Sequence, residues 1–372
     1  MLPSPLPTLT IGTRTSALAL WQTNYVIDAL QTAWPGLLCE ITPFVTQGDK
    51  TQAAGNPLPS IGGKGVFTLE LEAALRSGGI DLAVHSLKDL PVEDAPDLMI
   101  GAISRRADAR DVLVARNQWT LATLPPGAVV GTSSTRRAAQ LLLARPDLTI
   151  KSIRGNVGTR IGKVQQGDYD ATVLAAAGVE RLGLEDAVTE WIALDVMLPA
   201  PGQGALAVQC RADDPVIREL LALIDDAATR AAVSAERQFL HGLGGGCSAP
   251  VAAYATATAH ATGLHLRAFV ASPDGQRVVY LQGEGDAATV GSQLAQQALA
   301  QGVASWLDSH PGLPIQPARS QPLSGKRVVV TRAREQAGPL CEQLAAAGAT
   351  PLLIPMIQIA PLPDQTHLDQ MI

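Results

Sequence analysis

Strand-like apolar runs alternate with amphipathic helical patterns through the first 210 residues, and this alternation constrains the fold more than any other feature. The apolar run Leu9–Gly12, for example, precedes Ser16–Trp34, where apolar residues recur at helical spacing. Such alternation predicts an α/β fold of parallel sheets with helices on both faces. The later elements predicted in this way are helices at Val66–Arg76, Thr135–Arg145 and Thr159–Gln166, and strands at Ile80–His85, Ala128–Gly131, Thr149–Ile153, Asp170–Ala175 and within Ala200–Cys210.

The character of the chain changes from Asp225 onward, which predicts further domains in a chain of 372 residues. A helix–loop–strand pattern there indicates a smaller α+β domain, and the Pro-rich His310–Pro322 reads as a linker. The last stretch of about 48 residues opens another α/β domain but is too short to enclose a sizeable core. The predicted elements are helices at Asp226–His241, Ala287–Leu307 and Glu335–Ala347, and strands at Leu264–Ala271, Arg277–Leu281, Lys326–Thr331 and Pro351–Ile359.

Charge and cysteine usage narrow the class of protein. The chain has 28 basic and 34 acidic residues, a balance that argues against nucleic-acid binding. It shows no signal-peptide pattern and no apolar run of membrane-spanning length, so we expect no membrane partner. Its four cysteines form no CxxC pair, which suits a reducing cytoplasm. The histidines lack metal-ligand spacing, so no metal site is predicted.

Polar residues follow several of the predicted strands directly. Thr13–Ser16, His85–Asp89 and Thr132–Ser134 each stand between a strand and a helix or turn. Ligands of α/β sheets bind beyond the carboxyl ends of the strands, so these segments predict a binding cleft.

Arginines are concentrated with small hydroxyl residues and glycine in Gly131–Arg160. Arg136, Arg137, Arg154 and Arg160 each offer a planar fork of donors that stays charged, and helix N-termini add free N–H groups. Several carboxylates or phosphates need this kind of partner. We therefore expect a polyanionic small molecule.

Some of these residues have a plain structural interpretation as well. Ser133 and Ser134 with Arg136 and Arg137 could be a helix cap followed by solvent-facing arginines. Asp89 could pair with Lys88 or a nearby Arg, or it could stabilise a cationic intermediate or hold a proton.

Two loop residues also have alternatives. Cys247 could be an incidental buried thiol or, on a Gly-rich loop near arginines, a nucleophile or attachment point. Lys64 stands in a Gly-rich stretch that lacks the phosphate-loop spacing, so a lid or hinge with a ligand-facing Lys is expected.

The chain resembles the porphobilinogen deaminase (hydroxymethylbilane synthase) family in a series of segments that run in family order from residue 13 to residue 251. These segments are TRTSALALWQ, TQGD, GGKGVFTLELE, DLAVHSLKDLP, RRADARD, GTSSTRRAAQL, SIRGNVGTR, AAAGVERLG, LPAPGQGALAVQC and LGGGCSAPV. Departures are small: Thr68 and Glu180 stand where many members carry Lys, and Gly244 where an acidic residue is common.

The resemblance implies two doubly wound lobes like those of periplasmic anion-binding proteins and a smaller α+β domain that carries the cofactor cysteine. The implied boundaries are 1–105 with 200–222 for the first lobe, 106–199 for the second, 223–310 for the third domain, 311–324 for the linker and 325–372 for an incomplete fragment. That last fragment resembles the start of uroporphyrinogen-III synthase.

The resemblance also implies a transferase activity. The family condenses four porphobilinogen molecules head to tail on a dipyrromethane cofactor, releases ammonia each time, and hydrolyses the product to hydroxymethylbilane. The cofactor would be joined by a thioether to Cys247, and Asp89 would be the catalytic carboxylate. A monomer in the cytoplasm is expected. The alternative is a non-catalytic, two-lobed anion-binding protein.

The remaining site residues implied by the resemblance fall into two groups. Those expected to hold the cofactor are Ser86, Lys88, Asp89, Thr132, Ser133, Ser134, Arg136, Arg137, Arg154 and Gly155. Those expected to hold the substrate are Arg14, Ser16, Lys64, Arg154, Arg160, Ala175, Arg181 and Gln203.

Overall fold

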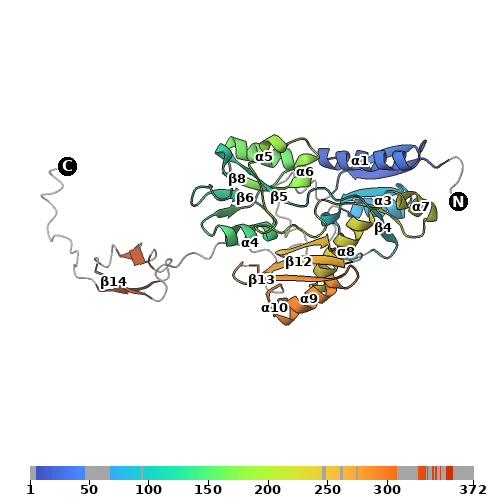
Figure 1. Cartoon of the computed structure of the whole chain (residues 1–372). Helices are drawn as coiled ribbons and strands as arrows, with labels where there is room; N and C mark the ends of the chain where they lie inside the picture. The colour runs from blue at the N-terminus through green and yellow to red at the C-terminus, as the bar shows by residue number, and fades with distance from the viewer. Residues whose placement is uncertain are drawn as a thin grey trace. The chain divides into compact units, whose positions relative to one another are not determined.

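Three β-sheets organise the described part of the larger unit of the computed structural model, Met1–Gln316, and a two-stranded sheet belongs to the smaller unit, Pro317–Ile372 (Figure 1). No helix in the described residues is long and apolar enough to span a bilayer. The structure describes residues 6–46, 68–93, 95–244, 249–259, 263–273, 275–307, 326–331, 333, 337–338, 340–341, 344 and 349–354.

The first sheet has helices on both of its faces, as the alternating pattern predicts. Helices α1 and α7 cover one face, where Leu30 and Leu220 pack with Ile11, and α3 covers the other face, where Leu71 packs with Ala83. In order across the sheet, the strands are β2 (Cys39–Phe44), β1 (Leu9–Arg14), β3 (Leu82–Ser86), β10 (Leu206–Arg211) and β4 (Leu98–Ile103), and the helices are α1 (Ala17–Ala33), α3 (Leu69–Arg76) and α7 (Pro215–Ala222).

The second sheet repeats this plan. Helix α4 packs on one face, and α5 and α6 pack on the other. In order across the sheet, the strands are β7 (Thr149–Lys151), β6 (Val129–Gly131), β8 (Ala171–Ala175), β5 (Asp111–Ala115) and β9 (Glu190–Trp191), and the helices are α4 (Thr135–Ala144), α5 (Val157–Gln166) and α6 (Ala176–Glu180).

Both sheets are mixed, so the prediction of parallel sheets is wrong in part. In the first sheet β10 runs antiparallel to β3 and β4, and in the second sheet β5 runs antiparallel to β8 and β9. Strand β10 returns to the first sheet after the chain has built the second. The chain therefore crosses between the two sheets twice, and the direction of a returning strand is set by that route.

The third sheet has one face on helices and the other on the second sheet. Ala252, Phe269 and Ala271 share a core cluster with α4, and the opposite face packs against α8 and α9. All its strands are antiparallel, as an α+β domain requires. Its elements are β11 (Val251–Ala257), β12 (Gly263–Ala271), β13 (Val278–Asp286), α8 (Ala227–Gly242), α9 (Val290–Ala300) and α10 (Ala304–Leu307).

Two predicted boundaries in this region are wrong. The single helix expected over Ala287–Leu307 is broken near Gly302, whose backbone φ is +82°. Glycine adopts this left-handed conformation without the steric penalty that a Cβ imposes, and it ends a helix. The strand expected to stop at Leu281 continues to Asp286 because it pairs with the whole length of β12.

The fully buried carboxylate of Glu236 ties the third sheet to both crossovers between the first two sheets. It accepts hydrogen bonds from Arg106 Nη1 and Nη2, at 2.6 and 3.1 Å, and from the backbone N–H groups of Gly202 and Ala255, both at 2.8 Å. The guanidinium of Arg106 also lies 4.8 Å from the ring centre of Tyr254. Parts of the chain that are far apart in sequence thus meet at one ion pair.

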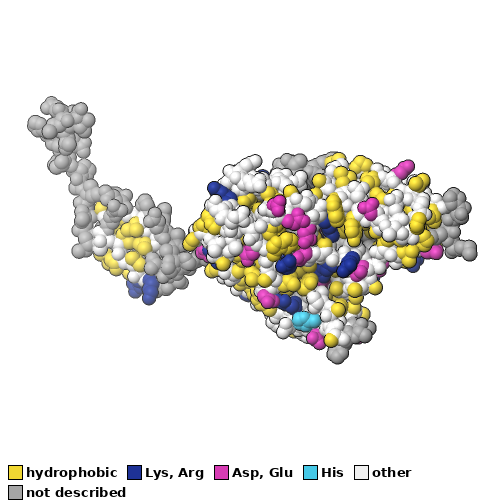
Figure 2. All heavy atoms as spheres, turned by 45° about the horizontal axis from the view of Figure 1, so that its top comes forward, with side chains coloured by type: hydrophobic (Ala, Val, Ile, Leu, Met, Phe, Trp, Pro, Cys, Tyr) yellow, Lys and Arg dark blue, Asp and Glu magenta, His cyan; other side chains and the backbone are white. Residues whose placement is uncertain are grey.

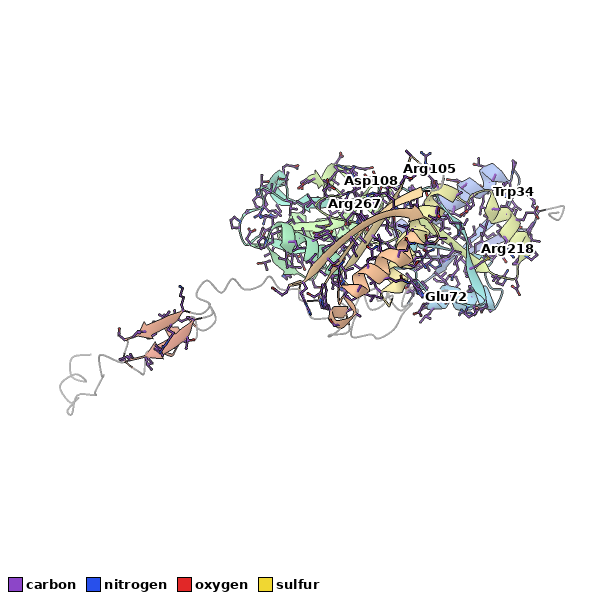
Figure 3. All side chains as sticks on the ribbon, turned by 60° about the horizontal axis from the view of Figure 1, so that its bottom comes forward. Trp34, Glu72, Arg105, Asp108, Arg218 and Arg267 are labelled. Atoms are coloured by element: carbon purple, nitrogen blue, oxygen red, sulfur yellow. The ribbon has the colours of Figure 1, made fainter. Side chains whose placement is uncertain are left out.

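The outer end of the first sheet is closed by its own helices. Trp34, which follows α1, donates its indole N–H to the carbonyl of Leu220 at 3.0 Å. Trp34 and Arg218 lie at this end, and Arg105 and Asp108 lie nearer the middle of the unit (Figure 3).

The smaller unit contains the parallel pair β14 (Arg327–Val330) and β15 (Thr350–Leu353). Both strands were predicted, although β15 was expected to extend to Ile359, and residues after 354 lie outside the described part. Most of the predicted helix at Glu335–Ala347, the Pro-rich linker and the loop at Lys50–Lys64 lie outside it as well.

Candidate functional site

Polar residues gather where strands of the first two sheets end. Arg14 is the last residue of β1, Ser86 the last of β3 and Ala175 the last of β8. Asp89 closes the short 3-10 helix η2 (Leu87–Asp89), which follows β3 directly. The strand-end pattern therefore brings these residues to the edge where α/β sheets bind their ligands.

Arg136 and Arg137 open α4 and are buried, with only 4% and 6% of their surface exposed. Arg136 Nη1 donates to Asp111 Oδ2 at 2.7 Å, and Arg137 Nη2 donates to Asp111 Oδ1 at 2.7 Å. Ser134 caps the helix by accepting from Arg137 N at 3.4 Å. The interpretation as a helix cap is thus right for Ser134, but the solvent-facing arginines that it implied are wrong.

Lys88 connects the first sheet to this cluster. Its Nζ donates to Gln203 Oε1 at 3.1 Å, and Gln203 is itself fully buried in the crossover. Gln203 Nε2 donates to the carbonyl of Ala109 at 2.8 Å and to Asp111 Oδ1 at 3.0 Å. Burial, followed by the charge of Arg137, lowers the pKa of Lys88 to about 8.

Asp89 lies in the same electrostatic environment. Burial and the charges of Arg137 and Arg154 together lower the pKa of Arg160 to about 10, and the charge of Asp89 opposes them. Asp89 likewise counteracts the lowering of the Lys88 pKa. The ion pairs of this cluster join Arg136 and Arg137 to Asp111, and the predicted alternative of a direct pair between Asp89 and a cation is not found in the described residues.

The turn before α5 needs a glycine. Gly155 has a φ of +117°, and a Cβ there would lie 2.6 Å from Thr159 Cγ2. Its carbonyl accepts from Arg160 Nε at 2.8 Å, and the carbonyl of Arg154 accepts from Lys163 Nζ at 3.1 Å. The turn therefore fixes the position of Arg160 Nε, from which the rest of the guanidinium extends.

The hydroxyl residues after β6 are held by the neighbouring loop. Ser133 Oγ donates to the carbonyl of Ile153 at 2.7 Å and lies 2.8 Å from Ser152 Oγ. Thr132 Oγ1 accepts from the backbone N–H of Ser134 at 3.2 Å. These contacts fix the N-terminus of α4 against the loop that carries Arg154.

The start of α1 borders the first-sheet side of the site. Ser16 caps the helix, and its Oγ accepts from Ala19 N at 3.3 Å. Gln22 Nε2 donates to Ser86 Oγ at 2.9 Å. The charge of Arg14 adds to burial in lowering the pKa of His85, so Arg14 lies near this strand end.

Arg181 follows α6 and links it to the crossover and to α1. Its Nη2 donates to the carbonyl of Gly204 at 2.7 Å, and its guanidinium lies 5.6 Å from the ring centre of Trp21. Trp21 in turn stacks on Tyr25 with ring centres 5.5 Å apart. A substrate-binding role for Arg181 stays a prediction.

Cys247 and Lys64 lie outside the described residues, so the predictions for the cofactor attachment and for the ligand-facing Lys remain predictions. Three other cysteines, Cys39, Cys210 and Cys341, are free thiols. In the described part of the chain, no three His, Cys, Asp or Glu side chains are grouped as metal ligands would be.

The described residues of the cluster carry a net positive charge. Five cations, Lys88, Arg136, Arg137, Arg154 and Arg160, influence one another or the two carboxylates, Asp89 and Asp111. Acidic and basic side chains also gather midway along the face of the larger unit shown in Figure 2. Two of these cations, Arg136 and Arg137, are buried and the other three are half-buried. Such an excess of cations is stable when anionic groups of a ligand complement it, so this donor set fits a small molecule with several carboxylates.

Two models of one protein family match the sequence of this chain. The model of the dipyrromethane cofactor-binding domain of porphobilinogen deaminase matches residues 9–219, and the model of the C-terminal domain of the same family matches residues 230–300. The chain belongs to the porphobilinogen deaminase family. The first of these two domains contains the cluster around the buried Asp111 and the exposed Asp89.

Curated relatives are similar over nearly their whole length. A porphobilinogen deaminase of Roseiflexus sp. is 52% identical over 299 residues, which cover 79% of this chain and 97% of the relative. The porphobilinogen deaminase of Brevibacillus brevis is 48% identical over 293 residues, covering 78% of this chain and 94% of the relative.

Solved structures are similar at a lower level. A putative periplasmic sulfonate-binding protein of Methylobacillus flagellatus superposes with a TM-score of 0.36 and 16% identity, covering 58% of this chain and 66% of that chain. This likeness says nothing about ligand or activity.

Proposed function

We propose that the cluster around Asp89 and Asp111 is the site at which this porphobilinogen deaminase joins porphobilinogen units head to tail. The transferase activity and the dipyrromethane cofactor follow from family membership. The single observation that supports this location best is the set of buried and half-buried cations at the strand ends of the first two sheets, coupled to two carboxylates. A non-catalytic anion-binding protein is not favoured, because the relatives that match along the chain are deaminases.

The substrate and the cofactor bring carboxylates that the cations of the site can bind. Every pyrrole unit carries an acetate and a propionate, so each condensation adds two negative charges. Lys88, Arg136, Arg137 and Arg154 would hold the cofactor and growing chain, with Arg14, Ser16, Arg160 and Arg181 on the incoming substrate. When bound, dipyrromethane supplies the free pyrrole carbon to which the next unit is joined.

Asp89 would supply negative charge where positive charge develops. The C–N bond of the protonated aminomethyl group of the substrate breaks, ammonia leaves with the bonding electrons, and a methylene-pyrrolenine cation remains on the substrate. A carboxylate fixed beside the pyrrole N–H stabilises that cation until the new C–C bond forms and a proton is lost. Asp89 itself is exposed, whereas Arg136 and Arg137 are buried, so the bound ligand would have to exclude the water that screens the Asp89 charge.

The domain boundaries are part of the proposal. Each of the three sheets has a core cluster of its own, beside the one that the second and third sheets share, and this supports two lobes and a third domain, with a smaller C-terminal fragment. We also propose that the protein works as a monomer in the cytoplasm. Free thiols at Cys39, Cys210 and Cys341 support a reducing compartment.

The intact mass of the purified active protein tests the cofactor assignment. We expect the polypeptide plus an adduct of two pyrrole units, which is lost in Cys247→Ser. Cys39→Ser, which changes a half-buried free thiol of the first sheet, is the matched control and should keep the adduct. An active protein with the mass of the unmodified polypeptide would contradict the assignment.

A further inference from the structure

Asp111 is the fully buried carboxylate of the site, at the first position of β5. Its Oδ1 accepts from Arg137 Nε at 3.1 Å, from Arg137 Nη2 at 2.7 Å and from Gln203 Nε2 at 3.0 Å, and its Oδ2 accepts from Arg136 Nη1 at 2.7 Å. Burial raises the pKa of this carboxyl, but the charges and hydrogen bonds of the two arginines outweigh burial and hold it well below its ordinary value. Asp111 is therefore ionised throughout the physiological range.

Each arginine also donates to a backbone carbonyl. Arg136 Nη1 also donates to the carbonyl of Leu198 at 2.7 Å, and Arg137 Nη1 donates to the carbonyl of Val173 at 2.9 Å. A planar guanidinium bound by two acceptors has a fixed orientation. The N–H groups that remain on each fork consequently point in set directions.

Asp111 also orients Lys88 indirectly, through the side chain of Gln203. The amide nitrogen of Gln203 faces Asp111 and the carbonyl of Ala109, so its amide oxygen must face the other way, where it accepts from Lys88 Nζ. The carboxylate thereby links the second sheet to η2 of the first sheet, directly before Asp89.

We propose that Asp111 is a positioning residue of the cofactor site, which directs the free donors of Arg136, Arg137 and Lys88 toward the carboxylates of the pyrrole ligand. This inference rests on the proposed function. Both carboxylate oxygens of Asp111 accept hydrogen bonds from side chains of the protein, so Asp111 does not contact the reacting atoms. Its effect on the ligand passes through the three cations.

Loss of the Asp111 charge should change both the orientation of the two arginines and the pKa of Lys88. Arg136 and Arg137 would face each other as unpaired like charges in a buried place, and they would turn away from their present orientation. Lys88 would also lose a charge that raises its pKa, so its pKa would fall below about 8. A residue that only held the fold together would not shift the titration of Lys88 in this direction.

The test compares Asp111→Asn with Asp170→Asn in the holoprotein. Asp170 is a matched control because its carboxylate also serves the second sheet, accepting from Val129 N at 2.8 Å, but lies outside the cluster. The first readout is the fraction of protein that carries the two-pyrrole adduct by intact mass. The second is the pH at which Lys88 becomes reactive toward an acylating reagent, measured by peptide mass. We expect Asp111→Asn to lose at least half of the adduct and to shift the Lys88 midpoint downward by half a pH unit or more, with no change in Asp170→Asn.

If Asp111→Asn does not fold, a second variant, Gln203→Met, tests the proposal, because it leaves the ion pairs of Asp111 with Arg136 and Arg137 intact. There we expect the adduct to remain and KM for porphobilinogen to rise at least fivefold, because Lys88 loses its acceptor. A full adduct with an unshifted Lys88 midpoint in Asp111→Asn, or an unchanged KM in Gln203→Met, would overturn the inference. Absence of the adduct from the parent protein would instead overturn the proposed function.

Discussion

Glu236 gives the sharpest stability prediction, because one buried carboxylate serves four donors from separate parts of the chain. In Glu236→Gln the shape of the side chain is kept and the charge is removed. The new amide NH₂ must face either Gly202 N or Ala255 N, since these bind different carboxylate oxygens. In either orientation the amide NH₂ faces a backbone N–H, so two hydrogen-bond donors point at each other. Arg106 also loses its counter-ion.

The size of the effect follows from burial. Glu236 is fully buried, and the side chain of Arg106 is 12% exposed. Removing one partner of a buried ion pair typically costs about 3–5 kcal/mol. The guanidinium keeps a contact with Tyr254 and a hydrogen bond to the carbonyl of Gln203 at 2.9 Å, so we expect a value near the lower limit, about 3 kcal/mol.

Urea unfolding followed by tryptophan fluorescence measures this loss. Asp97→Asn is the control, because it removes an ion pair with Arg76 at the surface, where we expect no measurable change. A Glu236→Gln protein whose free energy of unfolding lies within about 1 kcal/mol of the parent would refute the argument from burial.

Three further predictions concern other parts of the larger unit. Burial lowers the pKa of His85 from 6.5 to about 4, so the unfolded chain binds more protons between these values and the protein loses stability as the pH falls. The free energy of unfolding from urea titrations should fall by about 2 kcal/mol from pH 7.5 to 5. A fall of the same size in His85→Gln would argue against His85 as its source. Gly291→Ala would place a Cβ 2.1 Å from a backbone oxygen of α8 and should cost about 1–3 kcal/mol, whereas Gly162→Ala, with open space around it, should cost nothing, and equal melting curves would count against this packing. Trp21→Leu removes the ring beside Arg181 and should raise KM for porphobilinogen about threefold to tenfold in steady-state kinetics, and an unchanged KM would mean that the ring does not position Arg181.

Local patterns predicted the elements and the strand ends of this chain because both depend on neighbouring residues. The cap at Ser134 and the polar turns after β1, β3 and β6 follow from side-chain type and spacing alone. The direction of β10 could not be predicted in this way. It depends on the path the chain takes through the second sheet before it returns.

Asp111 itself was missed for the same reason, although Lys88, Arg136, Arg137 and Gln203 around it were predicted as site residues. Asp111 precedes Arg136 by 25 positions and Gln203 by 92, and nothing in its immediate sequence distinguishes it from a surface carboxylate. From the sequence alone, charged residues in the first turn of α4 are expected to face solvent. In the structure, the second sheet and the crossover bury them. The expected single carboxylate among the cations is in fact accompanied by a second one, and only tertiary packing shows it.

Turnover of porphobilinogen by the Asp89→Asn holoprotein tests the central claim most directly. The substitution keeps the shape of the side chain and removes the negative charge that would face the developing cation. We expect the variant to carry the two-pyrrole adduct in full, with kcat reduced by about a hundredfold or more. Turnover close to that of the parent in a fully loaded variant would contradict the assignment of this cluster as the catalytic site.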